Sequence, residues 1–252
     1  MLRGDADGLL DMADRIGIDR IGVMTWLGIQ TPLQDEGHRP VIAACQHPSA
    51  RFWGLATIQP GDKSDATKIA ELESLRKASG KILGLKPYPT FGLPYDHPKY
   101  AALWRYAEDH GLYVGIHPFH WYEPGEFAAI CGRHPDLRVV AYHAGCTYEI
   151  ADTVITLCHE FPNLHAEINY SSVTGGMIEY LVKGCGADRV LFGTDQPMRD
   201  PRPQLGWVVH SDLPVQTKKK ILAGNARAML GRLTRPADGA TRQAPSCVPA
   251  LV

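Results

Sequence analysis

Arg189-Val190-Leu191-Phe192-Gly193-Thr194-Asp195-Gln196-Pro197 is a short apolar run that follows a polar turn and closes in Gly-Thr-Asp. A run of this kind predicts a buried parallel strand, with Asp195 emerging at its carboxyl end. Two earlier apolar runs close in a histidine instead, residues 112–117 in His117 and residues 138–143 in His143. Three predicted strands therefore carry two histidines and an aspartate at their carboxyl ends, the edge at which loops converge in a barrel of alternating strands and helices.

The same unit, an apolar strand beside an amphipathic helix, repeats along the chain. Strands are predicted at residues 18–24, 52–58, 81–86, 112–117, 138–143, 164–170 and 189–195. Helices are predicted at residues 5–16, 39–47, 64–79, 99–110, 125–134, 148–160, 177–183 and 215–230. Strict alternation requires a parallel sheet with right-handed crossovers, and the near-eightfold repeat favours a distorted (β/α)8 TIM barrel. An open doubly wound sheet is the alternative, which is weakened because no G-x-G-x-x-G turn follows a strand.

The two ends of the chain depart from the regular repeat. The first element is a helix, which in such a barrel should follow a strand, so we expect the first strand of eight to be missing and to lie upstream of Met1. Residues 1–233 are predicted to form the α/β barrel domain. Residues 234–252 are rich in Pro, Ala, Gly, Thr, Gln and Ser without a periodic apolar face, which predicts a disordered tail.

Composition restricts the classes of partner. A hydrophobic content of 44%, a charged content of 21% and a net charge of -1 are typical of a soluble globular protein. Because there is no basic block, we expect neither nucleic acid nor a membrane as partner, and the apolar runs are too short to span a bilayer. The six cysteines form no C-x-x-C pair, which indicates small buried side chains in a reducing cytoplasm.

The residues at the strand ends point to metal-assisted chemistry. Histidine nitrogens and a carboxylate oxygen that converge from different strands are the ligands a hydrolytic divalent metal uses. A single histidine at a strand end is more often structural. Three such groups, His117, His143 and Asp195, are harder to explain as packing, since burying them unpaired costs several kcal/mol.

Other candidate residues lie at a strand end or in loops. Lys86 ends the strand at 81–86 and is predicted to bind a substrate carboxylate, although a lysine at a barrel mouth can also extend into solvent or pair with a structural acid. Trp26, His120 and Trp121 are predicted to line the pocket, although loop residues of these types often only cover it. Glu167 lies within the strand at 164–170, where alternation leaves its direction open, and Asn169 is an equal candidate to face inward.

The ordered series of motifs resembles the amidohydrolase superfamily, and more narrowly its amidohydrolase-related group with aminocarboxymuconate-semialdehyde decarboxylase and the resorcylate-type decarboxylases. The motifs are Gly84-Leu85-Lys86-Pro87-Tyr88-Pro89, Gly115-Ile116-His117-Pro118, Ala141-Tyr142-His143-Ala144-Gly145, Leu191-Phe192-Gly193-Thr194-Asp195 and Ile221-Leu222-Ala223-Gly224-Asn225-Ala226-Arg227. The resemblance implies a distorted barrel with one metal, zinc or manganese. It implies His117 as a metal ligand, Asp195 as a ligand or proton-transferring carboxylate, and His143 as a general base or a group that polarises the substrate.

One departure from that family affects the metal. Its members begin with a strand carrying an H-x-H pair that supplies two ligands, and neither His38 nor His47 matches this motif. A start codon assigned too late, a truncation, and a lineage that lost the pair all remain open. Losing two protein ligands should weaken metal binding by several kcal/mol.

These features predict a metal-dependent hydrolase or non-oxidative decarboxylase. Its predicted substrate is a small carboxylated molecule, and a cyclic one is among the candidates. The alternative is a metal-free or catalytically altered barrel that acts as a binding or scaffold partner. A homo-oligomer in which another chain completes the sheet is a third hypothesis.

Overall fold

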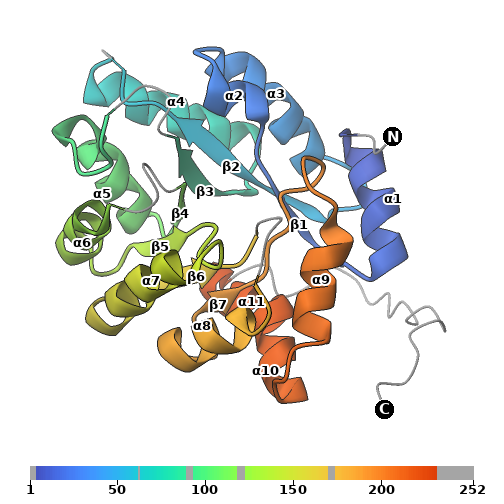
Figure 1. Ribbon diagram of the computed structural model, residues 1–252. Helices are drawn as coiled ribbons and strands as arrows, with labels where there is room; N and C mark the ends of the chain where they lie inside the picture. The colour runs from blue at the N-terminus through green and yellow to red at the C-terminus, as the bar shows by residue number, and fades with distance from the viewer. Residues whose placement is uncertain (1–3, 62, 89–92, 118–122, 170–173, 232–252) are drawn as a thin grey trace.

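The fold is a curled sheet of seven parallel strands surrounded by helices (Figure 1). The computed structural model describes residues 4–61, 63–88, 93–117, 123–169 and 174–231, so His120, Trp121 and the predicted tail at 234–252 lie outside the described residues. The strands pair in chain order: β1 Ile21–Val23, β2 Phe52–Ile58, β3 Ile82–Pro87, β4 Tyr113–Ile116, β5 Arg138–Ala141, β6 Leu164–Glu167 and β7 Val190–Leu191. This arrangement confirms the predicted (β/α) barrel with one strand fewer than eight among the described residues.

The helices follow the strands around the outside of the curled sheet (Figure 1). They are α1 Ala6–Ile16, α2 Trp26–Gln30, α3 Gln34–Cys45, α4 Asp65–Ala78, α5 Ala101–Asp109, α6 Pro124–Arg133, α7 Tyr148–Glu160, α8 Met177–Cys185, α9 Pro201–Val209, α10 Val215–Lys219 and α11 Asn225–Leu230. A 3-10 turn, η2 Pro98–Tyr100, precedes α5, and a π-helical turn, η3 Lys220–Gly224, joins α10 to α11. The last three elements, α10, η3 and α11, together span the single helix predicted at 215–230.

Alternating strand residues serve two separate cores. One set faces the helices in the main core, with fully buried side chains such as Leu85, Val139 and Val190. The other set faces the inside of the curl, where Leu55, Tyr113, Val140, Leu191 and Met229 form a smaller cluster. The two-residue period of a strand produces this division, because successive side chains point to opposite faces.

Two glycines make room for large side chains inside the curl. A Cβ at Gly115 would lie 2.3 Å from the hydroxyl of Tyr142, and a Cβ at Gly193 would lie 1.6 Å from Oε1 of Glu167. Real side chains cannot approach so closely. Glycine at these positions therefore lets Tyr142 and Glu167 point into the interior.

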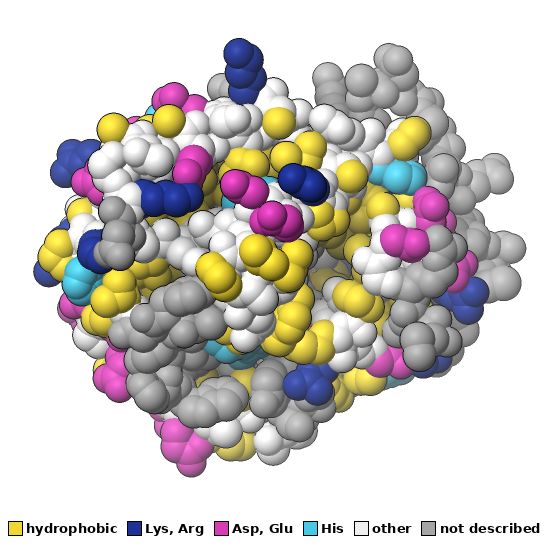
Figure 2. All heavy atoms as spheres, turned by 90° about the horizontal axis from the view of Figure 1, so that it is seen from above, with side chains coloured by type: hydrophobic (Ala, Val, Ile, Leu, Met, Phe, Trp, Pro, Cys, Tyr) yellow, Lys and Arg dark blue, Asp and Glu magenta, His cyan; other side chains and the backbone are white. Residues whose placement is uncertain are grey.

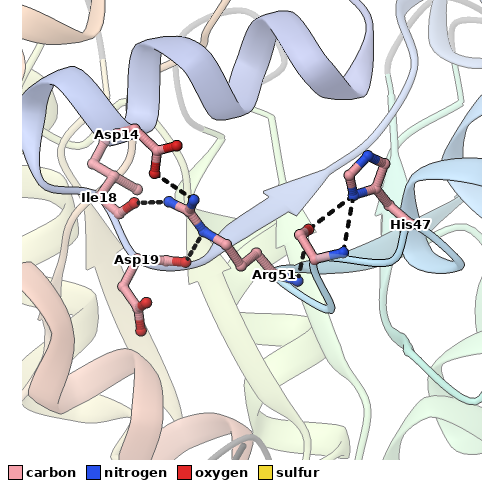
Figure 3. Close-up of polar contacts among 6 residues, drawn as sticks. Asp14, Ile18, Asp19, His47 and Arg51 are labelled. Carbon is pink, nitrogen blue, oxygen red and sulfur yellow. Dashed lines mark hydrogen bonds and ion pairs between the residues drawn. The ribbon is translucent and has the colours of Figure 1, made fainter. Parts of the chain in front are cut away.

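Arg51 ties the first helix to the first two strands (Figure 3). Its guanidinium donates to the Asp19 carbonyl oxygen at 2.7 Å, to Asp14 Oδ1 at 2.5 Å and to the Ile18 carbonyl oxygen. Gly17, in the left-handed conformation with φ of 78°, ends α1 just before these carbonyls. One side chain thus satisfies backbone groups that the turn between α1 and β1 leaves unpaired.

Two short helices lie where the sequence predicted none. Residues 26–30, expected in a loop, form α2, whose N-cap Thr25 accepts a hydrogen bond from Gly28 N. Residues 201–209 form α9, whose N-cap Asp200 is followed by Pro201 at the first helical position. Both caps are standard start signals, but neither segment carries an apolar stripe long enough to predict a helix by itself.

The sheet order begins with β1 and ends with β7, and no ladder joins these two strands among the residues that the structure describes. Strand β1 covers three residues and β7 only two, both shorter than predicted. Helix α11 lies against β7, and its Met229 packs with Leu191 in the interior cluster. The C-terminal helix thus closes part of the interior beside β7.

Asn225 fixes α11 to the end of β7, and we predict that Asn225→Ala destabilises the fold by about 2 kcal/mol. Its Nδ2 donates to the carbonyl oxygens of Ala187 and Val190 at 2.7 and 2.8 Å, and alanine leaves both carbonyls without this donor. The free energy of unfolding in urea measures the effect. Gln216→Ala, at an exposed site in α10, is the control and should leave that free energy unchanged; an equal loss in both variants would contradict the assignment.

Candidate active site

Two histidines form a hydrogen-bonded pair at the carboxyl ends of β4 and β5. His143 Nδ1 lies 2.8 Å from the carbonyl oxygen of Asn169, and His143 Nε2 lies 3.0 Å from Nδ1 of His117. A carbonyl oxygen only accepts, so Nδ1 of a neutral His143 carries the proton and its Nε2 accepts from His117. The basic nitrogen of the pair is then Nε2 of His117.

Both histidines are held in the neutral form. Burial, the nearby Lys86 and His143 lower the pKa of His117 to about 2. Burial also lowers the pKa of His143, while Asp195 and the hydrogen bond to Asn169 act in the opposite direction. At neutral pH both rings are therefore uncharged, so the pair can accept a proton but does not act as an acid.

His143 and Asp195 occupy an uncommon backbone conformation. Their φ angles are 63° and 55°, in the left-handed region that non-glycine residues seldom adopt. Each residue turns the chain sharply at the end of its strand, and Asn169 Nδ2 lies 3.5 Å from Oδ1 of Asp195. Strained positions of this kind cluster at functional sites, since the side chain must be aimed in one direction.

Lys86 is the central cation of this region. It is 1% exposed at the end of β3, and its Nζ has no hydrogen-bond partner among the described residues. The ammonium lies 4.2 Å from the ring centre of Tyr142. Burial lowers the pKa of Lys86 to about 7, against the attraction of Asp195 and Glu167. The alternative of a lysine that extends into solvent is therefore wrong.

Glu167 faces the interior beside this cation. Its Oε1 accepts from Asn169 N at 3.0 Å, while Oε2 has no partner among the described residues. Burial and the charge of Asp195 raise the pKa of Glu167 well above its usual range. The Glu167 side chain therefore favours its protonated form more than a free glutamate does, and it interacts with both Asp195 and Lys86.

Aromatic rings extend the site toward the surface. The ring of Tyr88 lies 4.6 Å from that of His117, and Trp26 meets Tyr88 edge-on at 6.3 Å. Trp26 is 55% exposed on α2. These rings, set at angles to one another, form an aromatic wall from the solvent to the histidine pair.

The structure brings together five of the seven residues predicted for this site. Lys86, His117, His143 and Asp195 interact directly or electrostatically, and Trp26 joins them through Tyr88. His120 and Trp121 lie outside the described residues. The sequence did not single out Tyr88 and Tyr142, and it left the direction of Glu167 open; Gly193, opposite Glu167, was the signal that could have decided it.

The described residues do not by themselves fit a metal centre. No group of three His, Cys, Asp or Glu side chains that could hold a metal forms within the described ranges. His117 and Asp195 supply two of the donor groups that the resemblance implies, and the ammonium of Lys86 lies close to both. The steps derived below therefore use only side chains of this chain.

Comparison with known proteins agrees with this geometry. A family model described as amidohydrolase matches residues 7–232. The chain belongs to the amidohydrolase family. A comparison with curated protein sequences gave no match. The resemblance seen in the strand-end motifs is thereby confirmed at the level of the family.

Solved structures of other amidohydrolase-fold enzymes superpose over most of their length. A 2,6-dihydroxybenzoate decarboxylase from Rhizobium has a TM-score of 0.72 and 16% identity, over 89% of this chain and 88% of that one. A dihydroxybenzoic acid decarboxylase from Polaromonas with bound manganese has a TM-score of 0.68 and 16% identity, over 89% and 85%. A 4-oxalomesaconate hydratase from Rhodopseudomonas palustris has a TM-score of 0.68 and 17% identity, over 90% and 81%. At these identities the likeness establishes the fold.

Side chains of both charges are mixed on one face of the molecule. Acidic and basic side chains are interspersed over the described part of the face seen from above, and hydrophobic side chains lie between them (Figure 2). None of the described helices has both the length and the apolar character needed to cross a bilayer. A small molecule in the mouth of the barrel is the partner that the site geometry suits.

We predict that Lys86→Met raises the free energy of unfolding at pH 6 by a few kcal/mol. The pKa of Lys86 falls from 10.5 to about 7 on folding, so the unfolded chain binds more protons between these values. The stability of the unsubstituted protein therefore rises with pH from 7 to 10.5, and the cost of the buried charge is complete below pH 7.

Urea unfolding at several pH values tests this prediction. The advantage of Lys86→Met should shrink steadily between pH 7 and 10, whereas Lys219→Met, at an exposed position in α10, should show no such trend. A Lys86→Met protein that is less stable than its parent at pH 6 would mean that the ammonium stabilises the fold.

Proposed function

We propose that this protein is an enzyme that acts on a small carboxylated ring compound, and that its main reaction is non-oxidative decarboxylation. The observation that carries the proposal is the unpaired, buried ammonium of Lys86 beside a neutral histidine pair at the carboxyl edge of the sheet. A buried cation without a partner needs an anion, and a substrate carboxylate supplies one.

The walls of the site suit a flat substrate. Trp26, Tyr88 and His117 follow one another in ring contact, which gives a planar ring a face to stack on. We include His120 and Trp121 in the proposed pocket only because of their positions in the sequence. With its carboxylate at Lys86, a ring stacked on this wall would place its hydroxyl or ring carbon near the histidine pair and Asp195.

The proton steps follow from the direction of the histidine hydrogen bonds. A proton taken from a substrate hydroxyl at Nε2 of His117 lets the Nδ1 proton of His117 move to Nε2 of His143. His143 is thereby the proposed general base, acting through His117, and it holds the transferred proton. The carboxyl of Asp195, after taking up a proton from solvent, is proposed to give that proton to the ring carbon. The C–C bond to the carboxylate then breaks as the C–H bond is completed, and carbon dioxide leaves.

A divalent metal, manganese or zinc, is part of the proposal. The manganese in the Polaromonas decarboxylase supports it. His117 and Asp195 are the residues of this chain that would hold the ion, and a residue that holds it would not also transfer the proton described above. Such an ion polarises a bound oxygen and so acidifies it.

Hydrolysis of a carboxylated substrate is the second reaction that the same residues can support, since a neutral histidine pair can also take a proton from water. The two decarboxylases and the hydratase with this fold support a lyase more than a hydrolase. A protein that binds carboxylated rings without converting them would instead favour the binding or scaffold alternative.

We predict that His143→Ala lowers kcat for decarboxylation by at least about 100-fold, the usual contribution of a general base. The assay follows the loss of substrate absorbance and release of carbon dioxide with 2,6-dihydroxybenzoate and 5-carboxyvanillate, the substrates named for related decarboxylases. His210→Ala, at an exposed histidine, should keep full activity. Unchanged turnover in a folded His143→Ala protein would remove His143 from this role.

We predict that the 252-residue chain retains less than stoichiometric metal after gel filtration, because its described residues supply no cluster of three donor side chains. Elemental mass spectrometry of protein purified without chelator measures the content. A His117→Ala, Asp195→Ala double variant should lose whatever metal remains. Full occupancy by zinc or manganese in the parent protein would show that further donors complete the site.

A further inference from the structure

Two cysteines meet between helices α7 and α8, away from the strand ends. Cys158 lies in the last turn of α7 and is 1% exposed, and Cys185 is the last residue of α8 and is 7% exposed. The helices approach closely because residue 184 is glycine, where a Cβ would lie 2.4 Å from Cδ1 of Ile155 on α7. The close approach brings the next residue, Cys185, up to α7.

Polar contacts fix the two thiols opposite each other. His159, next to Cys158, has its Nε2 at 2.8 Å from the carbonyl oxygen of Gly184, next to Cys185. The thiols of Cys158 and Cys185 hydrogen-bond to each other, and neither is in a disulfide. Cys158 Sγ also lies 3.8 Å from the carbonyl oxygen of Leu164.

A cation makes the two sulfurs unequal. The guanidinium of Arg189 hydrogen-bonds to the Cys158 thiol, and its Nη1 donates to the carbonyl oxygens of Cys158 and of Phe161, the latter at 3.0 Å. The hydrogen bond from Cys185 and then Arg189 lower the pKa of Cys158, while the same thiol contact and burial raise that of Cys185. Of the two thiols, Cys158 is therefore the one that loses its proton more readily.

We propose that Cys158 and Cys185 form a redox modification site, which a peroxide oxidises to a disulfide joining α7 to α8. The geometry that carries the proposal is the paired thiols at a glycine-mediated helix contact, with an arginine at one sulfur. The site does not depend on the proposed activity of the barrel.

The chemistry balances with hydrogen peroxide as the oxidant. The thiolate of Cys158 attacks one peroxide oxygen, so that an S–O bond forms, the O–O bond breaks and hydroxide leaves to take up the thiol proton as water. The sulfur of Cys185 then attacks the sulfenic sulfur of Cys158, an S–S bond forms, and the S–O oxygen leaves as a second water. Two thiols lose two electrons and peroxide gains them.

The cross-link would connect the helices that follow β5 and β6. These strands lead directly to His143 and Asn169, so the disulfide would fix the outer layer behind the histidine pair. A reductant such as a dithiol would reverse the bond through thiol–disulfide exchange.

The test treats the folded, reduced 252-residue protein with hydrogen peroxide, blocks remaining thiols and maps peptides by mass spectrometry. The chain has six cysteines, so formation of one disulfide should leave four blocked thiols, with a Cys158–Cys185 peptide as the main cross-linked species. Dithiothreitol should restore the two missing thiols. Because the unsubstituted protein answers the question, misfolding of a variant cannot hide the result.

Two variants make the assignment specific. Cys185→Ser should abolish the cross-link, whereas Cys45→Ser, at another buried cysteine in α3, should still form it. Retention of all the thiols after peroxide treatment would overturn the proposal. So would a main cross-link from Cys158 to Cys131, the other thiol that interacts electrostatically with it.

Discussion

The buried amine of Lys86 and the two carboxyls beside it control the charges at the mouth of this barrel. Taking an ammonium out of water is so costly that its pKa falls to about 7, even with Asp195 and Glu167 nearby. The same burial, with the charge of Asp195, raises the pKa of Glu167, and the cation in turn disfavours a charge on His117. Each group therefore sets the protonation state of the next. A parallel sheet makes this possible, because it collects the carboxyl ends of all its strands at one edge.

That arrangement depends on backbone features that work against stability. Gly193 has no side chain, which leaves room for Glu167 to point inward. His143 and Asp195 adopt left-handed φ angles at their strand ends. A fold selected only for stability would have an apolar residue at Lys86 and extended backbone at these positions. The concentration of such features at one edge of the sheet, opposite the ordinary apolar cluster around Val140 and Leu191, separates the part of the barrel that is built for packing from the part that is built for chemistry.

The sequence predicted the residues whose position follows from the end of a strand. His117, His143 and Asp195 each close an apolar run, so the order of the runs and the rule for parallel sheets were enough to place them at one edge. The direction of Glu167 could not be predicted, because it depends on register within β6, and a shift of one residue would have turned it toward the outer face of the sheet. Helix α2 was missed for a different reason. It has only five residues, too few for a periodic pattern, and its cap at Thr25 is a signal that many loops also carry.

The fold alone does not choose a reaction, since the same barrel serves decarboxylases and a hydratase. The direction of the hydrogen bonds that join His117, His143 and Asn169 favours one kind of reaction over another. The chain from His117 through His143 ends at the carbonyl oxygen of Asn169, which cannot take up a proton. Along these hydrogen bonds, a proton that enters at His117 moves to His143 and returns by the same route. Such a closed relay suits a reaction in which a hydroxyl lends its proton and regains it after the neighbouring C–C bond has broken, as in decarboxylation of a hydroxylated ring, better than one that releases a proton in every turnover.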